Sequence, residues 1–352
     1  IYGGNGIIGY SDIWNYKDVL VIGRVGAYCG SVHLAKGKCW VSDNAIAAIP
    51  HNDSDLKYLY YLLKLLDINK KQIGSSQPLL TQGILNSIKT DMFSDKTYRE
   101  KLGIFFSDID EKIDINNKIN KELEAMAKLI YDYWFVQFDF PDENGKPYKS
   151  SGGKMVYNEE LKREIPVGWD VGEIQDLAVC IMGQSPKGES YNQKGIGIPL
   201  LNGPANYKNG VLKAKTYTTQ PTRLCKKDDL ILCIRATIGN LVYSNQEFCL
   251  GRGVASVRPL FPELSEYIYY LLEREIEVFK VRATGSIIKG ITKEDLISAK
   301  VLVPNTEMLK RFSNIIKPYF DNIRLNNYQN NDLIELRDWL LPMLMNGQVK
   351  VN

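Results

Sequence analysis

The sequence predicts an α+β fold built from two copies of one unit, each a mixed, β-rich module followed by a long helix. Three observations predict it: segments that recur about 210 residues apart, an apolar seam in two long helical stretches, and a loop-rich connector between the halves. Self-similarity at a fixed offset is the signature of a duplicated architecture. We therefore expect a pseudo-two-fold internal repeat, in which two long antiparallel coiled-coil helices separate the modules.

The repeat is carried by four segments that keep their order at offsets of 208 to 211 residues. One chance match between apolar segments is unremarkable, but four in register indicate duplication. The pairs are Tyr58–Leu63 with Tyr267–Leu272, Gly74-Ser75 with Gly285-Ser286, Asp18–Arg24 with Asp229–Arg235, and Ala45–Ala47 with Gly253–Ala255.

The sequence predicts the same order of elements in each module: two strands, a Tyr/Leu-rich amphipathic helix, a Gly-Ser loop and a short helix. Thr81 before Leu85 and Thr292 before Leu296 stand where a helix-capping hydroxyl is expected. We expect the tyrosines to be core residues rather than platforms for stacked bases. The strands are 19–22 and 45–49 in the first module and 230–234 and 254–257 in the second, and the helices are 56–66 and 264–279.

The two long helices each carry apolar residues at alternating steps of four and three, which is the pattern of a coiled-coil seam. Each position of the second seam is a position of the first plus 210. The first seam is Leu102, Phe106, Ile109, Ile113, Asn116, Asn120, Leu123, Ala127, Ile130 and Trp134; the second is Phe312, Ile316, Tyr319, Ile323, Asn326, Asn330, Leu333, Arg337, Leu340 and Leu344.

Both seams place two asparagines in the middle: Asn116 and Asn120 in the first, Asn326 and Asn330 in the second. Polar residues at such positions cost stability and fix the register of a helix pair. They favour pairing of the two helices over the alternative, in which each helix packs only on its own module. Pro318 lacks a backbone N–H, so we expect it to kink the second helix near its start.

Residues 138–168 are rich in Pro, Gly, Lys and Ser, which predicts a connector made of loops rather than a domain. The resulting divisions are a first module at 1–98, a long helix at 99–137, the connector at 138–168, a second module at 169–304, and a second long helix with a tail at 305–352. Because the chain starts at Ile1 without Met, we expect a fragment or a processed chain.

The composition excludes several classes of protein. The net charge is +3, so a positive groove is possible without a strongly basic chain. No apolar stretch is long enough to span a bilayer. The six cysteines form no C-x-x-C pair and there are only two histidines, which disfavours a zinc site and favours a reducing, cytoplasmic compartment.

Catalytic motifs are absent from the sequence. It contains no G-x-x-x-x-G-K-[ST] phosphate loop and no Asn-Pro-Pro-aromatic run, and two histidines support neither a triad nor a metal cluster. The acidic residues lie mostly in helices among Lys and Arg, as on solvated faces. This favours a binding protein over an enzyme.

Several phrases resemble one known family, the specificity subunits of type I restriction–modification systems. Ile165–Ile174 resembles the phrase that opens their second half, and Gly183-Gln184-Ser185-Pro186 follows as it does there. Ile119–Phe138 resembles their central conserved helix, and Leu336–Gln348 the distal one. The likeness covers nearly the whole chain.

The resemblance implies a non-catalytic subunit that binds double-stranded DNA through two target recognition domains, each reading one half of a bipartite, asymmetric site. The conserved helices then set the spacer between the half-sites and dock two modification subunits, and restriction subunits complete the nuclease. S-adenosylmethionine, ATP and Mg²⁺ belong to these partners, and no cofactor to this chain. One departure is that the first domain lacks counterparts of about residues 172–209, so we expect it to be N-terminally incomplete.

Base reading requires side chains at base edges and contacts that hold the phosphates. The candidates lie in loops: Arg24 and Arg235 end strands, Gln184, Ser185 and Lys187 occupy a Gly/Pro loop, and Lys208 follows a tyrosine in a Lys-Asn loop. Four more precede short helices, whose N-termini suit phosphate: Ser75, Gln77, Ser286 and Lys289. The alternatives are a repeat scaffold that only assembles protein partners, and an independent nuclease or methyltransferase.

Overall fold

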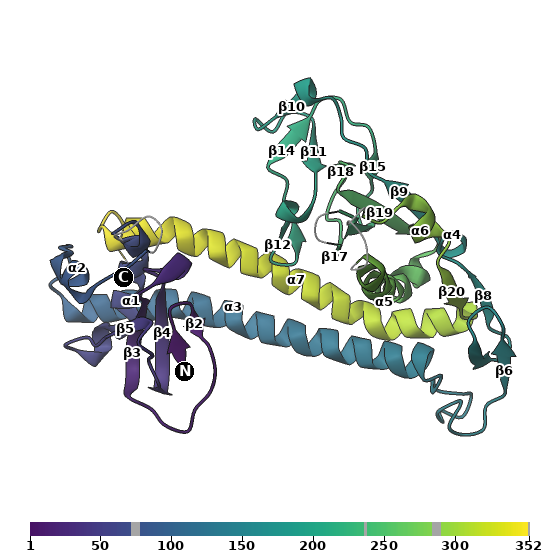
Figure 1. Ribbon diagram of the computed structural model, residues 1–352, viewed down its shortest axis with the longest axis horizontal. Helices are drawn as coiled ribbons and strands as arrows, with labels where there is room; N and C mark the ends of the chain where they lie inside the picture. The colour runs from purple at the N-terminus through teal and green to yellow at the C-terminus, as the bar shows by residue number, and fades with distance from the viewer. Residues whose placement is uncertain (72–77, 236–237, 284–289, 351–352) are drawn as a thin grey trace. The chain divides into compact units, whose positions relative to one another are not determined.

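The computed structural model describes residues 1–71, 78–235, 238–283 and 290–350. The chain divides into two compact units, residues 1–115 with 330–352 and residues 116–329. Long helix α3 begins in the first unit and ends in the second, and α7 does the reverse. Figure 1 traces the elements along the chain. No described helix combines the length and apolar character that crossing a bilayer requires.

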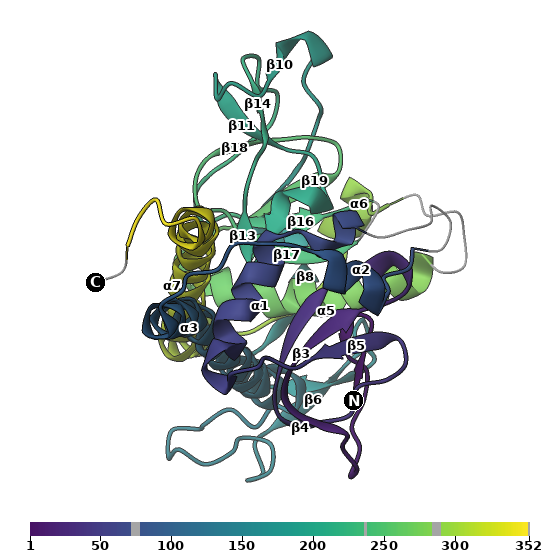
Figure 2. The same cartoon turned by 90° about the vertical axis from the view of Figure 1, so that its left-hand side faces the viewer.

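The first unit is a three-stranded antiparallel sheet, ordered β4-β3-β5, with helix α1 along β3 and β4 (Figure 2). Val19 and Val21 pack on one face of the sheet, and Ile22 on the other with Leu80. The elements are β1 (Tyr2–Gly3), β2 (Gly6–Ile7), β3 (Tyr16–Gly23), η1 (Gly26–Tyr28), β4 (Val32–Cys39), β5 (Ala45–Ala48), η2 (Asp53–Asp55), α1 (Leu56–Leu65), η3 (Ile68–Lys71), α2 (Gln82–Ser87), the start of α3 (Lys96–Tyr131) and the end of α7 (Thr306–Met345).

The second unit contains the same sheet with one strand more, in the order β17-β16-β19-β9. Helix α5 packs on β17 and β19 (Figure 1), as α1 packs on its own sheet. A five-stranded sheet, β10-β14-β11-β18-β15, and the pair β20-β8 complete the module. The unit therefore repeats the first and adds to it.

The elements of the second unit follow in chain order. They are the turn Asp132–Val136 after α3, β6 (Met155–Asn158), β7 (Arg163–Pro166), β8 (Asp170–Glu173), α4 (Ile174–Leu177), β9 (Ala178–Met182), η5 (Gly188–Ser190), β10 (Tyr191–Asn192), β11 (Ile198–Leu201), η6 (Pro204–Asn206), β12 (Tyr207–Lys208), β13 (Val211–Leu212), β14 (Thr216–Thr218), β15 (Leu224–Cys225), β16 (Leu230–Cys233), β17 (Gly239–Tyr243), β18 (Phe248–Leu250), β19 (Val254–Pro259), η7 (Pro262–Leu264), α5 (Ser265–Ala283), α6 (Lys293–Ile297) and β20 (Lys300–Val303).

The predicted helix caps are confirmed. Thr81 is the N-cap of α2, and its hydroxyl accepts the N–H of Ile84 at 3.2 Å. Thr292 is the N-cap of α6 and forms a reciprocal capping box with Asp295. Both short helices begin where the hydroxyl satisfies an N–H that has no partner within the helix.

The predicted seams are confirmed, because every position of both seams is buried or half-buried. Helix α7 continues through Pro318, so the proline does not interrupt it. The carbonyl that the proline leaves without an N–H donor is that of Asn314, four residues earlier, and both residues are exposed. Water can therefore satisfy this carbonyl.

The connector at 138–168 is more ordered than the sequence predicts. It contains the hairpin β6–β7. Phe140 stacks on Tyr148 and on Trp169, with ring centroids 4.6 and 5.0 Å apart. Aromatic packing orders a segment whose Pro and Gly content is typical of loops.

One alignment of the repeat is shifted by a residue. The N–H of Arg24 donates to Asn44 and its carbonyl accepts from Leu80, whereas Ile234, rather than Arg235, makes the two corresponding bonds, with Gly253 and Ile291. Arg24 therefore corresponds to Ile234, and Val25 to Arg235. The two arginines do not hold equivalent places.

Candidate nucleic-acid interface

At one end of the four-stranded sheet of the second unit, β9 and β16 end beside the start of β19. The Gly183 N–H donates to the Val254 carbonyl at 3.0 Å, which extends the β9–β19 ladder past its last strand pair. One step further, the Arg252 N–H meets the Ser185 hydroxyl at 3.4 Å. Beyond the last pair of the β16–β19 ladder, the Ile234 N–H donates to the Gly253 carbonyl at 3.0 Å; Arg235 follows Ile234, and Arg252 precedes Gly253. Ser185 and Arg235 thus follow the ends of β9 and β16, and Arg252 lies in the turn before β19, the strand that β9 and β16 flank.

Glycines let the loops beneath this edge approach one another closely. A Cβ at Gly183 would stand 2.1 Å from the Gly251 carbonyl oxygen. A Cβ at Gly253 would stand 2.1 Å from the Asn202 carbonyl oxygen. Backbone therefore lies so close to backbone here that only glycine fits at these two positions.

The same edge continues into the five-stranded sheet. The Gln184 N–H donates to the Leu250 carbonyl at 2.8 Å, and the Leu250 N–H donates to the Arg223 carbonyl at 2.8 Å. The side chains of Gln184 and Arg223 are exposed. We call the five residues Gln184, Ser185, Arg223, Arg235 and Arg252 the basic edge.

The arginines of the basic edge differ from two other arginines of the same unit, Arg258 and Arg324. Arg258 forms two 2.7 Å bonds to the buried carboxylate of Asp229, and Arg324 pairs with Asp228 at 2.9 Å. Among the described residues, Arg223, Arg235 and Arg252 form no ion pair, and all three are exposed. The Arg252 Nε donates to the Ser185 hydroxyl at 3.4 Å, and a guanidinium outside an ion pair can hold guanine or a phosphate in a bidentate manner.

The structure brings three of the predicted residues together, namely Gln184, Ser185 and Arg235. Lys187 is exposed nearby in the chain, with its Nζ 4.0 Å from Glu189. Lys208 lies instead on the β12–β13 hairpin, whose tip at Gly210 lies against Asn327 of α7. Arg24 belongs to the first unit. Ser75, Gln77, Ser286 and Lys289 lie outside the described residues.

Arg223 and Arg252 were not predicted from the sequence. Arg252 stands between two glycines, a signal that the sequence does display. Its neighbours Ser185 and Arg235 are far away in the chain, however, and only the strand register shows that the three meet.

The predicted register asparagines make polar contacts between the helices. In the second unit, the Asn116 amide donates to Gln329 at 2.8 Å. The Asn120 side chain donates to Asn327 at 2.9 Å and accepts from Asn326 at 2.8 Å. In this unit the two helices therefore run antiparallel. Asn330 is buried in the first unit. Asn327 and Gln329 lie beside the predicted seam and were not anticipated.

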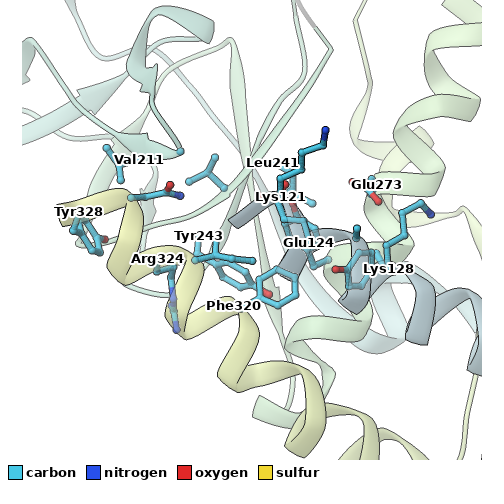
Figure 3. A pocket seen from close by; sticks show the side chains of 17 residues that line it. Lys121, Glu124, Lys128, Val211, Leu241, Tyr243, Glu273, Phe320, Arg324 and Tyr328 are labelled. Carbon is cyan, nitrogen blue, oxygen red and sulfur yellow. The ribbon is translucent and has the colours of Figure 1, made fainter. Parts of the chain in front are cut away.

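A cavity of about 370 Å³ lies in the second unit where β17, α5 and the two long helices meet (Figure 3). Lys121 and Glu124 reach it from α3, and Phe320 and Arg324 from α7. Burial raises the pKa of Glu124, and the nearby Glu273 raises it further. The corresponding cavity of the first unit is about 610 Å³ and includes Asp110 and Arg337 among its lining residues. The repeat thus extends to these cavities, but their chemistry differs.

The two units define a duplicated α+β protein, and comparison with known proteins gives its family. The family model for the type I restriction modification DNA specificity domain matches residues 3–125 and again residues 166–336. The chain therefore belongs to this family, and each half carries one copy of the domain.

Curated relatives agree with this assignment. The chain is 27% identical over 303 residues to the putative type I restriction enzyme MjaX specificity subunit of Methanocaldococcus jannaschii, covering 83% of this chain and 68% of that protein. It is 24% identical over 342 residues to the MjaIX specificity subunit of the same organism, covering 92% and 76%. The type I system S subunit from M. genitalium superposes with a TM-score of 0.68 at 17% identity, covering 96% of this chain and 86% of that one.

The chain is accordingly the DNA sequence-recognition subunit of a type I restriction–modification system, as the sequence predicted. Subunits of this kind are not catalytic, and catalysis lies in their partners. The scaffold alternative is not favoured.

Proposed function

We propose that the second unit reads one half of a bipartite DNA site through the basic edge, and that the first unit reads the other half. The observation that carries the proposal is that three exposed arginines, which form no ion pair with any residue the structure describes, lie with Gln184 and Ser185 at one end of a sheet. Arginine recognises guanine, and glutamine recognises adenine, in the major groove.

The rigidity of the basic edge supports base reading over general attraction. Long, mobile lysines hold phosphate without distinguishing sequence, and they make affinity depend on salt. The residues of the edge instead follow strands or stand between closely packed glycines. Fixed donors of this kind discriminate between bases, because a wrong base leaves them unpaired.

Repeated apolar patches support the docking of two modification subunits. In the second unit, Met126 and Leu129 of α3 are 49% and 66% exposed. In the first unit, their repeat counterparts Leu336 and Trp339 of α7 are 43% and 62% exposed. Exposed apolar pairs on a helix suit a partner helix. One such patch in each unit fits one modification subunit for each unit.

The remaining partners follow from the same assignment. Restriction subunits would join this complex to complete the nuclease, and the partner subunits would use S-adenosylmethionine, ATP and Mg²⁺. All six cysteines of the chain are free thiols, which supports a reducing, cytoplasmic location.

The helices would act as a ruler for the spacer. A helix of 36 residues such as α3 spans roughly 50 Å at about 1.5 Å per residue, which exceeds one DNA turn of about 35 Å. Inserting about four residues, one helical turn, into both helices should lengthen the accepted spacer and leave both half-sites unchanged. An unchanged spacer in methylation mapping would refute the ruler.

A module exchange tests the reading function. Residues 172–300 are replaced by those of a relative with a different target, and methylation is mapped in the presence of the modification subunits. We expect one half-site to change and the other half-site to persist. If the protein only assembles partners, both half-sites will stay unchanged. If the isolated chain cleaves or methylates DNA, it is an enzyme in its own right.

A further inference from the structure

Three surfaces of the first unit are not covered by any residue that the structure describes, whereas a single continuous segment covers their counterparts in the second unit. The first surface is the outer edge of β5. In the second unit, the corresponding strand β19 pairs with β9 on this side, and Val254 to Val257 are fully buried. Among the described residues, no strand pairs with the outer edge of β5, and Ala45, Ala47 and Ala48 remain half-exposed.

The second surface is helix α2. Its counterpart α6 contacts both α4 and β9, and it buries Leu296 completely. Helix α2 buries none of its residues. Its apolar side chains Ile84 and Leu85 stay half-exposed, and the exposed Ile49 lies at the end of β5.

The third surface is the stretch Thr90–Phe93. Its counterpart β20 is a strand because it pairs with β8 over four residues. Thr90–Phe93 forms no strand. It lines a cavity of about 490 Å³ together with Leu62 and Met345. Met345 holds the repeat position of Phe135, against which Trp169 packs in the second unit, with ring centroids 5.8 Å apart.

We propose that these three surfaces form one receptor for a strand–helix–strand segment. In the second unit, β8, α4 and β9 are consecutive, from Asp170 to Met182, and Trp169 precedes them. One such segment would pair with Thr90–Phe93, cover α2 and add a strand to β5. The inference rests on the repeat and not on DNA reading.

The occupant is a polypeptide segment other than residues 1–352, with the chemistry of Trp169–Met182. It carries an aromatic residue for the cavity, a short capped helix and an apolar strand. The second unit's own segment does not fill the role, because it is already paired with β19 and β20. An open strand edge next to exposed apolar side chains is what strand addition requires.

The test uses the full chain and a labelled synthetic peptide with the sequence of Trp169–Gln184, and it measures anisotropy together with amide exchange. We expect saturable binding and at least tenfold slower exchange at Ala47. The Arg24–Asn44 bond turns alternate residues of β5 toward β3, so the Ala47 N–H points outward. The Ala47→Pro variant removes this donor at an edge position that tolerates proline, and it should weaken binding at least tenfold. A peptide carrying Ile181→Pro should bind equally poorly.

A fusion guards against a segment that binds too weakly as a free peptide. The same segment is joined to Ile1 by a flexible Gly/Ser linker, which raises its effective concentration to about the millimolar range. If Ala47 exchanges as fast in this fusion as with a scrambled segment, the receptor does not exist. Equal binding of the Ile181→Pro peptide would also overturn the proposal. So would a dimer in which two copies exchange Asp170–Met182, detected by native mass spectrometry.

Discussion

Helix α1 of the first unit and its counterpart α5 of the second unit both pack against the long helices, but the residues that make this contact differ in chemistry. In the first unit, Tyr61 donates to Asp110 at 2.7 Å, and Arg337 pairs with the same carboxylate at 2.5 Å. At the repeat positions in the second unit stand Tyr270, Phe320 and Ala127, and the rings of Tyr270 and Phe320 meet edge to face at 5.8 Å. The contact is therefore a polar network in the first unit and aromatic packing in the second.

A second pair of positions shows the same contrast. Arg99 and Asp55 form a two-bonded ion pair at 2.8 and 2.9 Å, with side chains only 11% and 8% exposed. Their repeat counterparts are Leu309 and Leu264, both buried. The fold therefore does not require the charges. A buried pair adds little stability over well-packed apolar residues, but it penalises any arrangement that separates its partners.

The largest expected effect comes from the aromatic core of the second unit. Phe312 is fully buried, and its ring centroid lies 4.9 Å from that of Phe135. We expect Phe312→Ala to reduce the stability of this unit by about 4 kcal/mol. Leu102 is the repeat counterpart and is also fully buried, so Leu102→Ala should cost the first unit about 3 kcal/mol. Amide exchange measured separately for each unit gives both stability losses. A greater loss for Leu102→Ala than for Phe312→Ala would contradict this expectation.

The next effect comes from the ion pair of the first unit. Arg99→Met leaves the Asp55 carboxylate buried without its charged partner, and we expect a loss of about 3 kcal/mol at neutral pH. The double variant Asp55→Leu with Arg99→Leu copies the second unit, and it should be within about 1 kcal/mol of the wild type. If the double variant lost as much stability as Arg99→Met, the leucine pair of the second unit could not replace the ion pair of the first. Chemical denaturation of the four proteins completes the cycle.

The same ion pair predicts a pH dependence. Hydrogen bonds from Arg99 lower the pKa of Asp55 below its usual value. A lowered folded pKa gives stability that is present above the unfolded pKa of about 4 and is lost as the pH falls through the folded value. The difference in stability between wild type and Arg99→Met should therefore shrink below about pH 4. A constant difference from pH 7 to pH 2 would rule out this linkage.

The smallest effect concerns Glu273 in the second unit. Burial raises its pKa, with Asp132 adding to the rise and Lys128 opposing it. A raised folded pKa weakens the fold above that pKa, and the penalty vanishes below the unfolded value of about 4.3. Glu273→Gln should therefore stabilise the unit by less than about 1 kcal/mol at pH 7 and have no effect at pH 4. Thermal unfolding at both pH values measures this stabilisation. A stabilisation at pH 4 as large as that at pH 7 would contradict the raised pKa of Glu273.

Features set by local chemistry could be predicted from the sequence. The caps at Thr81 and Thr292 depend on residues three positions away, and the seams depend on a regular spacing along a helix. The repeat could be recognised because its offset is nearly constant. Its exact alignment at Arg24 could not, because a one-residue shift leaves the apolar pattern of the strand similar.

Features set by distant strands could not be predicted. Arg252 joins Ser185 and Arg235 only through the registers of β9, β16 and β19. The connector's order depends on Phe140 meeting Trp169, which no local pattern specifies. Gln184 was selected from the sequence for its loop, but Arg223 was not, since its exposure follows from the pairing of β15 with β18.

The most direct test of the account is methylation mapping with the double variant Arg235→Ala and Arg252→Ala, assembled with the modification subunits. Each lost base contact should cost about 1–3 kcal/mol of discrimination, or roughly ten- to a hundredfold. Arg252→Lys alone should keep the attraction to phosphate and still relax base choice. We expect one half-site to become degenerate, while the other half-site and the spacer are retained. An unchanged target with wild-type methylation would contradict the central claim that this edge reads DNA.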